Sequence, residues 1–218
     1  MPVTSAREEI LAKVRAAVGR SADRPVPAVP ASARMAPREG GDDQSEMELL
    51  LGEIAKVGGV TRRLHSARSI PAALRELVEA EAIHRATVWE TPELQRLGVA
   101  DSLRALGVAV VPGTAAPQQL AECELGVTGV DAALPETGTL LLCSAADKPR
   151  VVSLLPRVHL ALLRPSVMRA DLPQAFAAIQ AEGYAVAITG PSRTSDIELT
   201  VTIGVHGPRT LQIWVIGP

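Results

Sequence analysis

The residue types that could do chemistry gather in three short segments of the C-terminal half. The first, residues 126–139, carries the carboxylates of Asp131 and Glu136 among threonines and glycines. A carboxylate beside hydroxyl groups can act as a base, a nucleophile or a hydrogen-bond acceptor for a ligand. In the alternative interpretation the segment is a tight turn, and both carboxylates accept hydrogen bonds from loop amides. Local composition leaves both interpretations open.

The second segment, residues 190–198, has the sequence GPSRTSDIE and follows a short apolar run. Its hydroxyl groups, backbone N–H groups and the guanidinium of Arg193 suit a carboxylate or phosphate ligand. A position after the carboxyl end of a strand would favour ligand binding in an open α/β sheet. The alternative is a capped turn in which Arg193 pairs with Asp196 or Glu198. The segment matches neither a Walker loop nor a dinucleotide fingerprint.

The third segment, residues 204–209, places His206 between small residues and a proline. Its imidazole could reach a ligand or carry a proton, and a plain turn residue is the alternative. The other histidines are scattered along the chain, at His65, His84 and His159. Because no HxH or HExxH spacing occurs, a dedicated metal site is not expected.

Composition narrows the classes of function. The formal charge of −2 and the aromatic content of 2% give no broad footprint or stacking platform for nucleic acid. Cys123 and Cys143 form no CxxC pair and are expected to be reduced core thiols. An iron–sulfur cluster normally needs four thiolates, so this chain is not expected to hold one alone. No apolar run approaches the roughly 18 residues of a membrane span, and no signal-peptide pattern is present, so a cytoplasmic location is expected.

Hydrophobic periodicity predicts the elements that position these segments. An amphipathic helix is expected over residues 5–18, a flexible linker rich in Pro and Gly over 19–45, and one α/β domain over 46–218. Within the domain, short all-apolar runs alternate with amphipathic helices, which predicts an open, mostly parallel and partly mixed sheet flanked by helices. The expected strands are 60–65, 86–90, 108–112, 124–130, 138–143, 158–164, 185–190 and 210–216, with a strand or strand–helix mixture at 196–205. The expected helices are 46–57, 69–82, 92–106 with a break near Gly98, 115–122 and 171–182.

The motifs ETGTL at 136–140, GPSRTSDIE at 190–198 and GVHGP at 204–208 occur together in one order and spacing. In this the chain resembles the LUD-domain family, over roughly residues 46–217, and especially its lactate-utilisation protein C branch. The resemblance implies a fold like that of ribose-phosphate isomerase, glucosamine-phosphate deaminase and the CoA transferases. It also implies a part in a system that oxidises L-lactate to pyruvate, with iron–sulfur clusters in partner proteins and no cofactor in this chain.

The resemblance also suggests roles for individual residues, by analogy at the level of the fold. Glu136 is the first candidate for a base or nucleophile. Arg193, with Ser192 and Thr194, would hold a carboxylate or phosphate. The residues that would orient the ligand or relay protons are Asp196, Glu198 and His206. The remaining candidates for ligand binding are Thr137, Gly138, Thr139 and Gly190.

Two other functions fit the same residues. The chain could be a stand-alone enzyme of the isomerase or CoA-transferase type, with Glu136 opposite the anion-binding segment 190–198. It could also be a binding module that senses a small anion without turning it over. The sequence leaves open whether this chain is itself catalytic and whether it forms a homo-oligomer.

Overall fold

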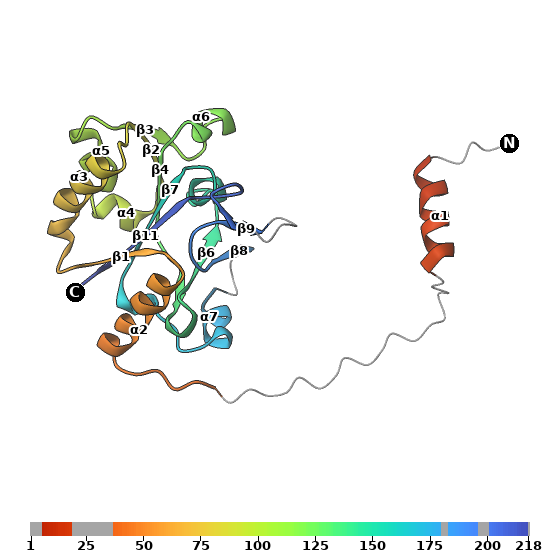
Figure 1. Ribbon diagram of the computed structural model, residues 1–218, viewed down its shortest axis with the longest axis horizontal. Coiled ribbons are helices and arrows are strands. Elements are labelled where there is room, and N and C mark those ends of the chain that lie inside the picture. The colour runs from red at the N-terminus through yellow and green to blue at the C-terminus, as the bar shows by residue number, and fades with distance from the viewer. Residues whose placement is uncertain (1–5, 19–36, 180–182, 196–200, 218) are drawn as a thin grey trace. The chain divides into compact units, whose positions relative to one another are not determined.

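The computed structural model describes residues 6–18, 37–179, 183–195 and 201–217 (Figure 1). The chain divides into two units, residues 1–36 and 37–218. The first contains helix α1 (Ala6–Val18), which confirms the helix expected there. The apolar side chains of Ile10, Leu11 and Val14 on α1 are exposed. Residues 19–36, most of the expected linker, lie outside the described residues.

A six-stranded sheet forms the centre of the second unit, in the order β1-β11-β7-β4-β2-β3. Every neighbouring pair in it is parallel. Every residue of β4 and β7 is buried, as expected for strands covered on both faces. The expected α/β fold is therefore confirmed. The strands are β1 (Val60–Leu64), β2 (Arg85–Val88), β3 (Ala109–Pro112), β4 (Leu125–Thr128), β7 (Val158–Leu163) and β11 (Thr210–Ile216).

Helices α3 (Ile70–Ala80), α4 (Pro92–Arg96) and α5 (Val99–Ala105) lie on one side of the sheet (Figure 1). The break expected near Gly98 is confirmed, since this residue has a φ of 64° and separates α4 from α5. Helix α6 (Pro117–Ala121) precedes β4. No helix in the described part of the chain is long and apolar enough to cross a membrane.

Helix α2 (Asp43–Lys56) begins three residues earlier than expected. The reason is an N-terminal cap that the periodicity did not reveal, in which the carboxylate of Asp42 accepts a hydrogen bond from the Ser45 amide at 2.8 Å. This contact, with a second hydrogen bond from Ser45, lowers the pKa of Asp42. Helix α2 therefore begins inside the range expected to be linker.

The antiparallel strands of the domain do not extend the main sheet. Strands β5 (Ala132–Leu134), β6 (Thr139–Ser144) and β8 (Tyr184–Ile188) form a separate antiparallel sheet instead. Helix α7 (Leu172–Ile179) packs on this small sheet around buried residues that include Cys143 and Ile179. Figure 1 shows β6, β8 and α7 on the side of the main sheet opposite α3. Strand β5 was missed because its three residues lie inside the segment taken for a turn.

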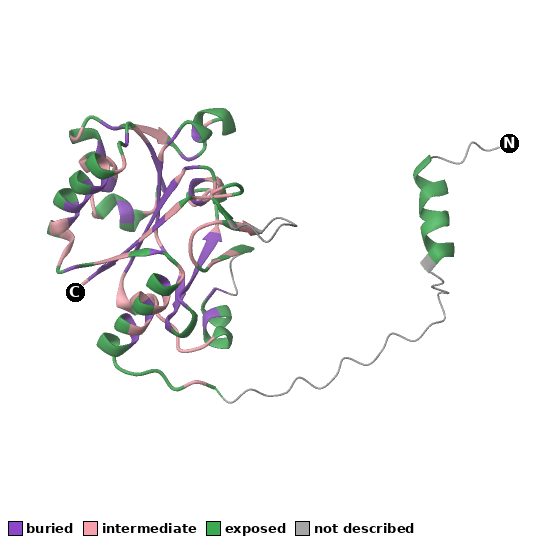
Figure 2. Cartoon of the chain, viewed as in Figure 1, coloured by how far each residue is buried: buried purple, intermediate pink, exposed green. Residues whose placement is uncertain are grey.

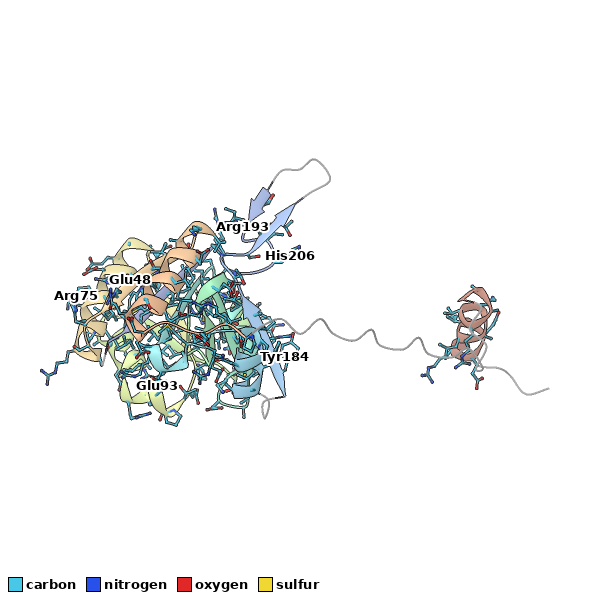
Figure 3. The ribbon with its side chains drawn as sticks, turned by 90° about the horizontal axis from the view of Figure 1, so that it is seen from below. Glu48, Arg75, Glu93, Tyr184, Arg193 and His206 are labelled. Carbon is cyan, nitrogen blue, oxygen red and sulfur yellow. The ribbon has the colours of Figure 1, made fainter. Side chains whose placement is uncertain are left out.

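Strands β9 (Arg193–Ser195) and β10 (Val201–Ile203) pair as an antiparallel hairpin that projects from the body (Figure 3). The expected element at 196–205 is thus a strand at 201–203, and residues 196–200 lie outside the described residues. Short 3-10 helices lie between these elements: η1 (Ala67–Ser69), η2 (Pro135–Thr137), η3 (Arg150–Ser153) and η4 (Pro165–Val167). Burial is concentrated in the inner strands of the main sheet, whereas the edge strands β1 and β3 are mostly exposed or intermediate (Figure 2). Trp214 of β11 is among the largest fully buried side chains.

Candidate functional site

Packing against α2 explains part of the sequence of the first segment, residues 126–139. Glu136 is exposed on η2, which packs on this helix. Gly138 follows with a φ of 63°, and a Cβ atom added there would lie 2.8 Å from the backbone nitrogen of Ile54. Only glycine accepts both that backbone conformation and so close a neighbour. The glycine of the ETGTL motif is therefore explained by the approach of η2 to α2.

A chain of hydroxyl groups joins the first segment to the second. The Oγ1 atoms of Thr137 and Thr139 lie 2.8 Å apart, and Thr139 Oγ1 lies 2.7 Å from Thr189 Oγ1. Thr189 directly precedes Gly190, so the two motifs meet where β6 and β8 pair. The structure thus brings together two segments that are about fifty residues apart in the sequence.

The carboxylate of Asp131 is engaged within its own hairpin. One oxygen accepts a hydrogen bond from the Cys143 amide at 2.7 Å, and the other from Lys148 Nζ at 2.8 Å. These contacts fasten the turn between β4 and β5 to strand β6. Asp131 thus accepts hydrogen bonds from a strand amide and a lysine side chain, and its role toward a ligand stays a prediction.

Arg193 lies at the base of the β9–β10 hairpin (Figure 3). Its guanidinium donates a close hydrogen bond to the carbonyl oxygen of Val57, the residue that caps the C-terminus of α2. A cation at that position compensates the unpaired carbonyl groups at the helix end. Thr194 lies opposite Thr202 in the hairpin. Asp196 and Glu198, the partners expected for Arg193, lie outside the described residues.

The second and third segments meet through backbone hydrogen bonds at Ser192. Its amide donates to the carbonyl of Pro208 at 3.0 Å, and its own carbonyl accepts from the Gly204 amide at 2.9 Å. Gly207 also lies against the Ser192 side chain, because a Cβ atom added there would be 3.2 Å from Ser192 Cβ. The two motifs therefore form one structural unit.

A pocket of about 200 Å³ opens beside this unit, and we call it the motif pocket. Gly190, Ser192 and His206 are the sequence-predicted site residues that line it. The other seven described candidates are not among its lining residues. The full lining is residues 153–154, 186–192 and 206–208, together with His159 and Leu211.

His159 is the residue that sequence reasoning missed. It lies in β7, is fully buried, and its Nε2 is 2.9 Å from Thr128 Oγ1. Its Nδ1 has no hydrogen-bond partner among the described residues, which is unusual for a buried nitrogen. Burial lowers the pKa of His159 to about 4, so the imidazole is neutral at pH 7. The signal in the sequence was a single histidine inside an otherwise apolar strand.

The sequence analysis expected a ligand site at the carboxyl end of a strand in an open sheet, and the motif pocket lies elsewhere. Gly190 does follow the carboxyl end of a strand, but that strand is β8 of the small antiparallel sheet. The lining residues of the main sheet, His159 and Leu211, come second in β7 and β11. The pocket is thus at the amino ends of the parallel strands, and the rule for the carboxyl ends of open sheets does not account for it.

The motif pocket offers a mixed set of polar groups on an apolar background. Hydroxyl groups come from Ser153, Thr189 and Ser192, and an exposed imidazole comes from His206. The Ser153 hydroxyl already donates to the carbonyl oxygen of Arg150 at 3.0 Å. The hydroxyl groups of Thr189 and Ser192 and the imidazole of His206 can donate hydrogen bonds to a small acid, and the buried neutral imidazole of His159 lies beside them. Among the described residues no group of three or more His, Cys, Asp or Glu side chains could hold a metal ion. Both cysteines are buried, and burial raises the pKa of the Cys123 thiol.

The amino-acid sequence of the chain is similar to a known domain family and to several known proteins. Residues 47–216 match the model of the LUD domain. The Lactate utilization protein C of Shouchella clausii is 31% identical over 146 residues, which are 62% of this chain and 64% of that protein. The protein of the same name from Bacillus licheniformis is 38% identical over 99 residues, 42% of this chain and 41% of the relative. The chain thus matches less than two thirds of the length of each of these relatives.

A solved structure shares the fold. The crystal structure of a DUF162 family protein from Deinococcus radiodurans superposes with a TM-score of 0.58 at 20% identity. The superposition covers 82% of this chain and all of the other. The family model covers most of the second unit, including all three chemical segments. This chain therefore belongs to the LUD domain family.

Proposed function

We propose that this chain is the cluster-free component of a system that oxidises L-lactate to pyruvate, and that its motif pocket binds the small carboxylate. The observation that carries the proposal is the likeness to proteins named Lactate utilization protein C, over a family match that includes the whole motif pocket. A LUD domain alone would leave the substrate open. The names of these relatives supply the substrate class.

The size of the motif pocket favours a ligand of a few carbon atoms. Its volume of about 200 Å³ lies below the roughly 300–1,000 Å³ of sites for drug-sized ligands and cofactors. The hydroxyl groups of Thr189 and Ser192 and the imidazole of His206 would orient the acid. Arg193 is not assigned this role, because it does not line the motif pocket and its guanidinium reaches the carbonyl of Val57 at the end of α2.

Oxidation of lactate to pyruvate releases two electrons and two protons, so the system needs an electron acceptor. We assign this role to partner proteins that carry iron–sulfur clusters. Cys123 and Cys143 are the only cysteines of the chain, and two thiolates are too few for such a cluster. This chain would then bind the carboxylate, and the partner proteins would carry the electrons.

The alternative of a stand-alone enzyme that uses Glu136 has less support. Glu136 is exposed on η2 and does not line the motif pocket, and Arg193 of the anion-binding segment is engaged with α2. A module that senses the anion without turnover would use the same pocket. The two functions differ in one consequence. Growth on lactate would depend on a component of the oxidising system but not on a sensing module.

Complementation of a gene deletion tests the proposal. In the host organism, deletion should abolish growth on L-lactate but not on glucose, and the wild-type gene should restore it. His206→Ala should restore growth poorly, since it removes the imidazole from the motif pocket. His84→Ala is the matched control, because His84 is exposed and lies outside the pocket, and it should complement fully. Normal growth of the deletion strain on lactate would refute the proposal and favour a sensing role.

A further inference from the structure

A second and larger cavity, of about 490 Å³, opens at the opposite edge of the main sheet. Strands β1, β11 and β7 are parallel neighbours, with Leu64 paired to Ile216 and Val215 paired to Leu163. Their carboxyl ends therefore meet at one edge, where open α/β sheets commonly bind ligands. We call this cavity the carboxyl-edge cleft. None of its lining residues lines the motif pocket.

The apolar part of the carboxyl-edge cleft comes from two layers. Strands β1 and β11 contribute Leu64, Val215 and Ile216, and helix α2 contributes Met47. All four side chains are buried, so a ligand would meet a fixed apolar surface. A cavity of this size and character suits a ligand with a substantial apolar body.

Two arginines stand in the lining of the same cleft, directly at strand ends. Arg164 follows β7, and Arg63 is the penultimate residue of β1. Arg63 donates from Nη2 to Gln44 at 2.8 Å, and Arg164 donates from Nη1 to the carbonyl of Gly217 at 3.4 Å. Each guanidinium has five N–H donors, so these contacts leave donors for a ligand.

The acidic partners of these arginines are weakly held. Arg63 Nη1 lies 3.8 Å from Glu48, and Arg164 Nε lies 3.2 Å from Glu93, with both glutamates half-exposed or more. Exposed ion pairs of this kind contribute little to stability, so a ligand anion could replace them at low cost. Within the lining itself, Asp43 is the one carboxylate beside the two guanidinium groups.

We propose that the carboxyl-edge cleft binds an organic acid with an extended apolar body, and that Arg63 and Arg164 hold its anionic group. The apolar body would cover Leu64, Ile216 and Met47. The chemical class differs from that proposed for the motif pocket, since lactate has no apolar body long enough to fill the cleft. The proposal does not depend on the role in lactate utilisation.

Isothermal titration calorimetry with octanoate tests the proposal on the full chain. Octanoate should bind, and Arg63→Gln and Arg164→Gln should each weaken it about tenfold, the effect of losing one charge-assisted hydrogen bond. Arg75→Gln is the matched control, because Arg75 is exposed on α3 outside the cleft (Figure 3), and octanoate affinity should not change. Acetate and inorganic phosphate should bind at least about tenfold more weakly than octanoate, because they lack the apolar body.

Several outcomes would overturn the proposal. Absence of octanoate binding would do so, as would equal affinity in the wild type and Arg63→Gln. Arg63 is half-exposed, so its substitution is expected to leave the fold intact, and the thermal unfolding midpoint checks this. Phosphate binding as tight as that of octanoate would show a plain anion site and contradict the proposed ligand class.

Discussion

At the scale of single residues, His159 has the most unusual environment in the motif pocket. Its imidazole lies within the main sheet, bonded through one nitrogen to Thr128 and unpartnered at the other among the described residues. A protonated imidazole there would lack solvation, so burial holds the neutral form. A neutral ring nitrogen beside a small polar pocket can accept or donate one hydrogen bond to a ligand or to water.

The lowered pKa of His159 predicts a loss of stability in acid. The unfolded chain binds the proton near pH 6.5 and the folded chain only near pH 4, so the free energy of unfolding falls as the pH falls between these values. The shift corresponds to about 3 kcal/mol. His159→Gln should remove this part of the pH dependence while keeping a hydrogen bond to Thr128. Urea unfolding measured from pH 7 to pH 4 tests it.

The control for this experiment is His84→Gln, since the His84 side chain is 79% exposed. Its pH dependence of unfolding should match that of the wild type over the same range. If His159→Gln and the wild type lost stability equally between pH 6.5 and 4, the buried neutral imidazole would not be the cause.

At the scale of elements, the close contact between η2 and α2 requires the glycine of the ETGTL motif. Gly138 and Gly98 have nearly the same backbone conformation, with φ and ψ of 63° and 33° against 64° and 27°. A Cβ atom on Gly138 would strike the backbone of α2, whereas one on Gly98 would meet nothing within 4 Å. Substitution of Gly98 by alanine therefore measures the cost of the backbone conformation alone, and substitution of Gly138 adds the steric clash with α2.

Gly98→Ala should lower the free energy of unfolding by about 1 kcal/mol, the cost of a left-handed conformation for a residue with a side chain. Gly138→Ala should cost about 3 kcal/mol, because overpacking against α2 adds to the same strain. Denaturant unfolding of both variants measures the difference. Equal losses in the two variants would show that η2 does not depend on close contact with α2.

Sequence patterns predicted the elements well where periodicity and burial agree. The apolar runs of β4 and β7 are buried on both faces, and Gly98 breaks its helix as expected. Strand β5 could not be predicted, because three residues between turns carry no period. The separate small sheet could not be predicted either, since pairing between β6 and β8 depends on contacts between residues forty or more positions apart.

At the scale of the whole molecule, the parallel sheet separates two cavities of different character. The motif pocket lies at the amino ends of β7 and β11, and the carboxyl-edge cleft lies at the opposite ends of the same strands. The sequence named Ser192 and His206 as separate candidates, and the structure places both in the lining of the motif pocket. It could not predict His159, because strand register and burial decide that its imidazole lies beside the pocket. The roles expected for Glu136 and Asp131 stay predictions.

The four histidines of the chain provide the most direct test of the motif pocket. His159 and His206 line it, His65 lines the carboxyl-edge cleft, and His84 is exposed outside both. Long-range ¹⁵N–¹H NMR spectra of the imidazoles report on all four at once during a titration with L-lactate or pyruvate. We predict that the signals of His159 and His206 shift together and saturate, while those of His65 and His84 stay unchanged. Unchanged signals from His159 and His206, or equal shifts at all four histidines, would contradict a small-carboxylate site in the motif pocket.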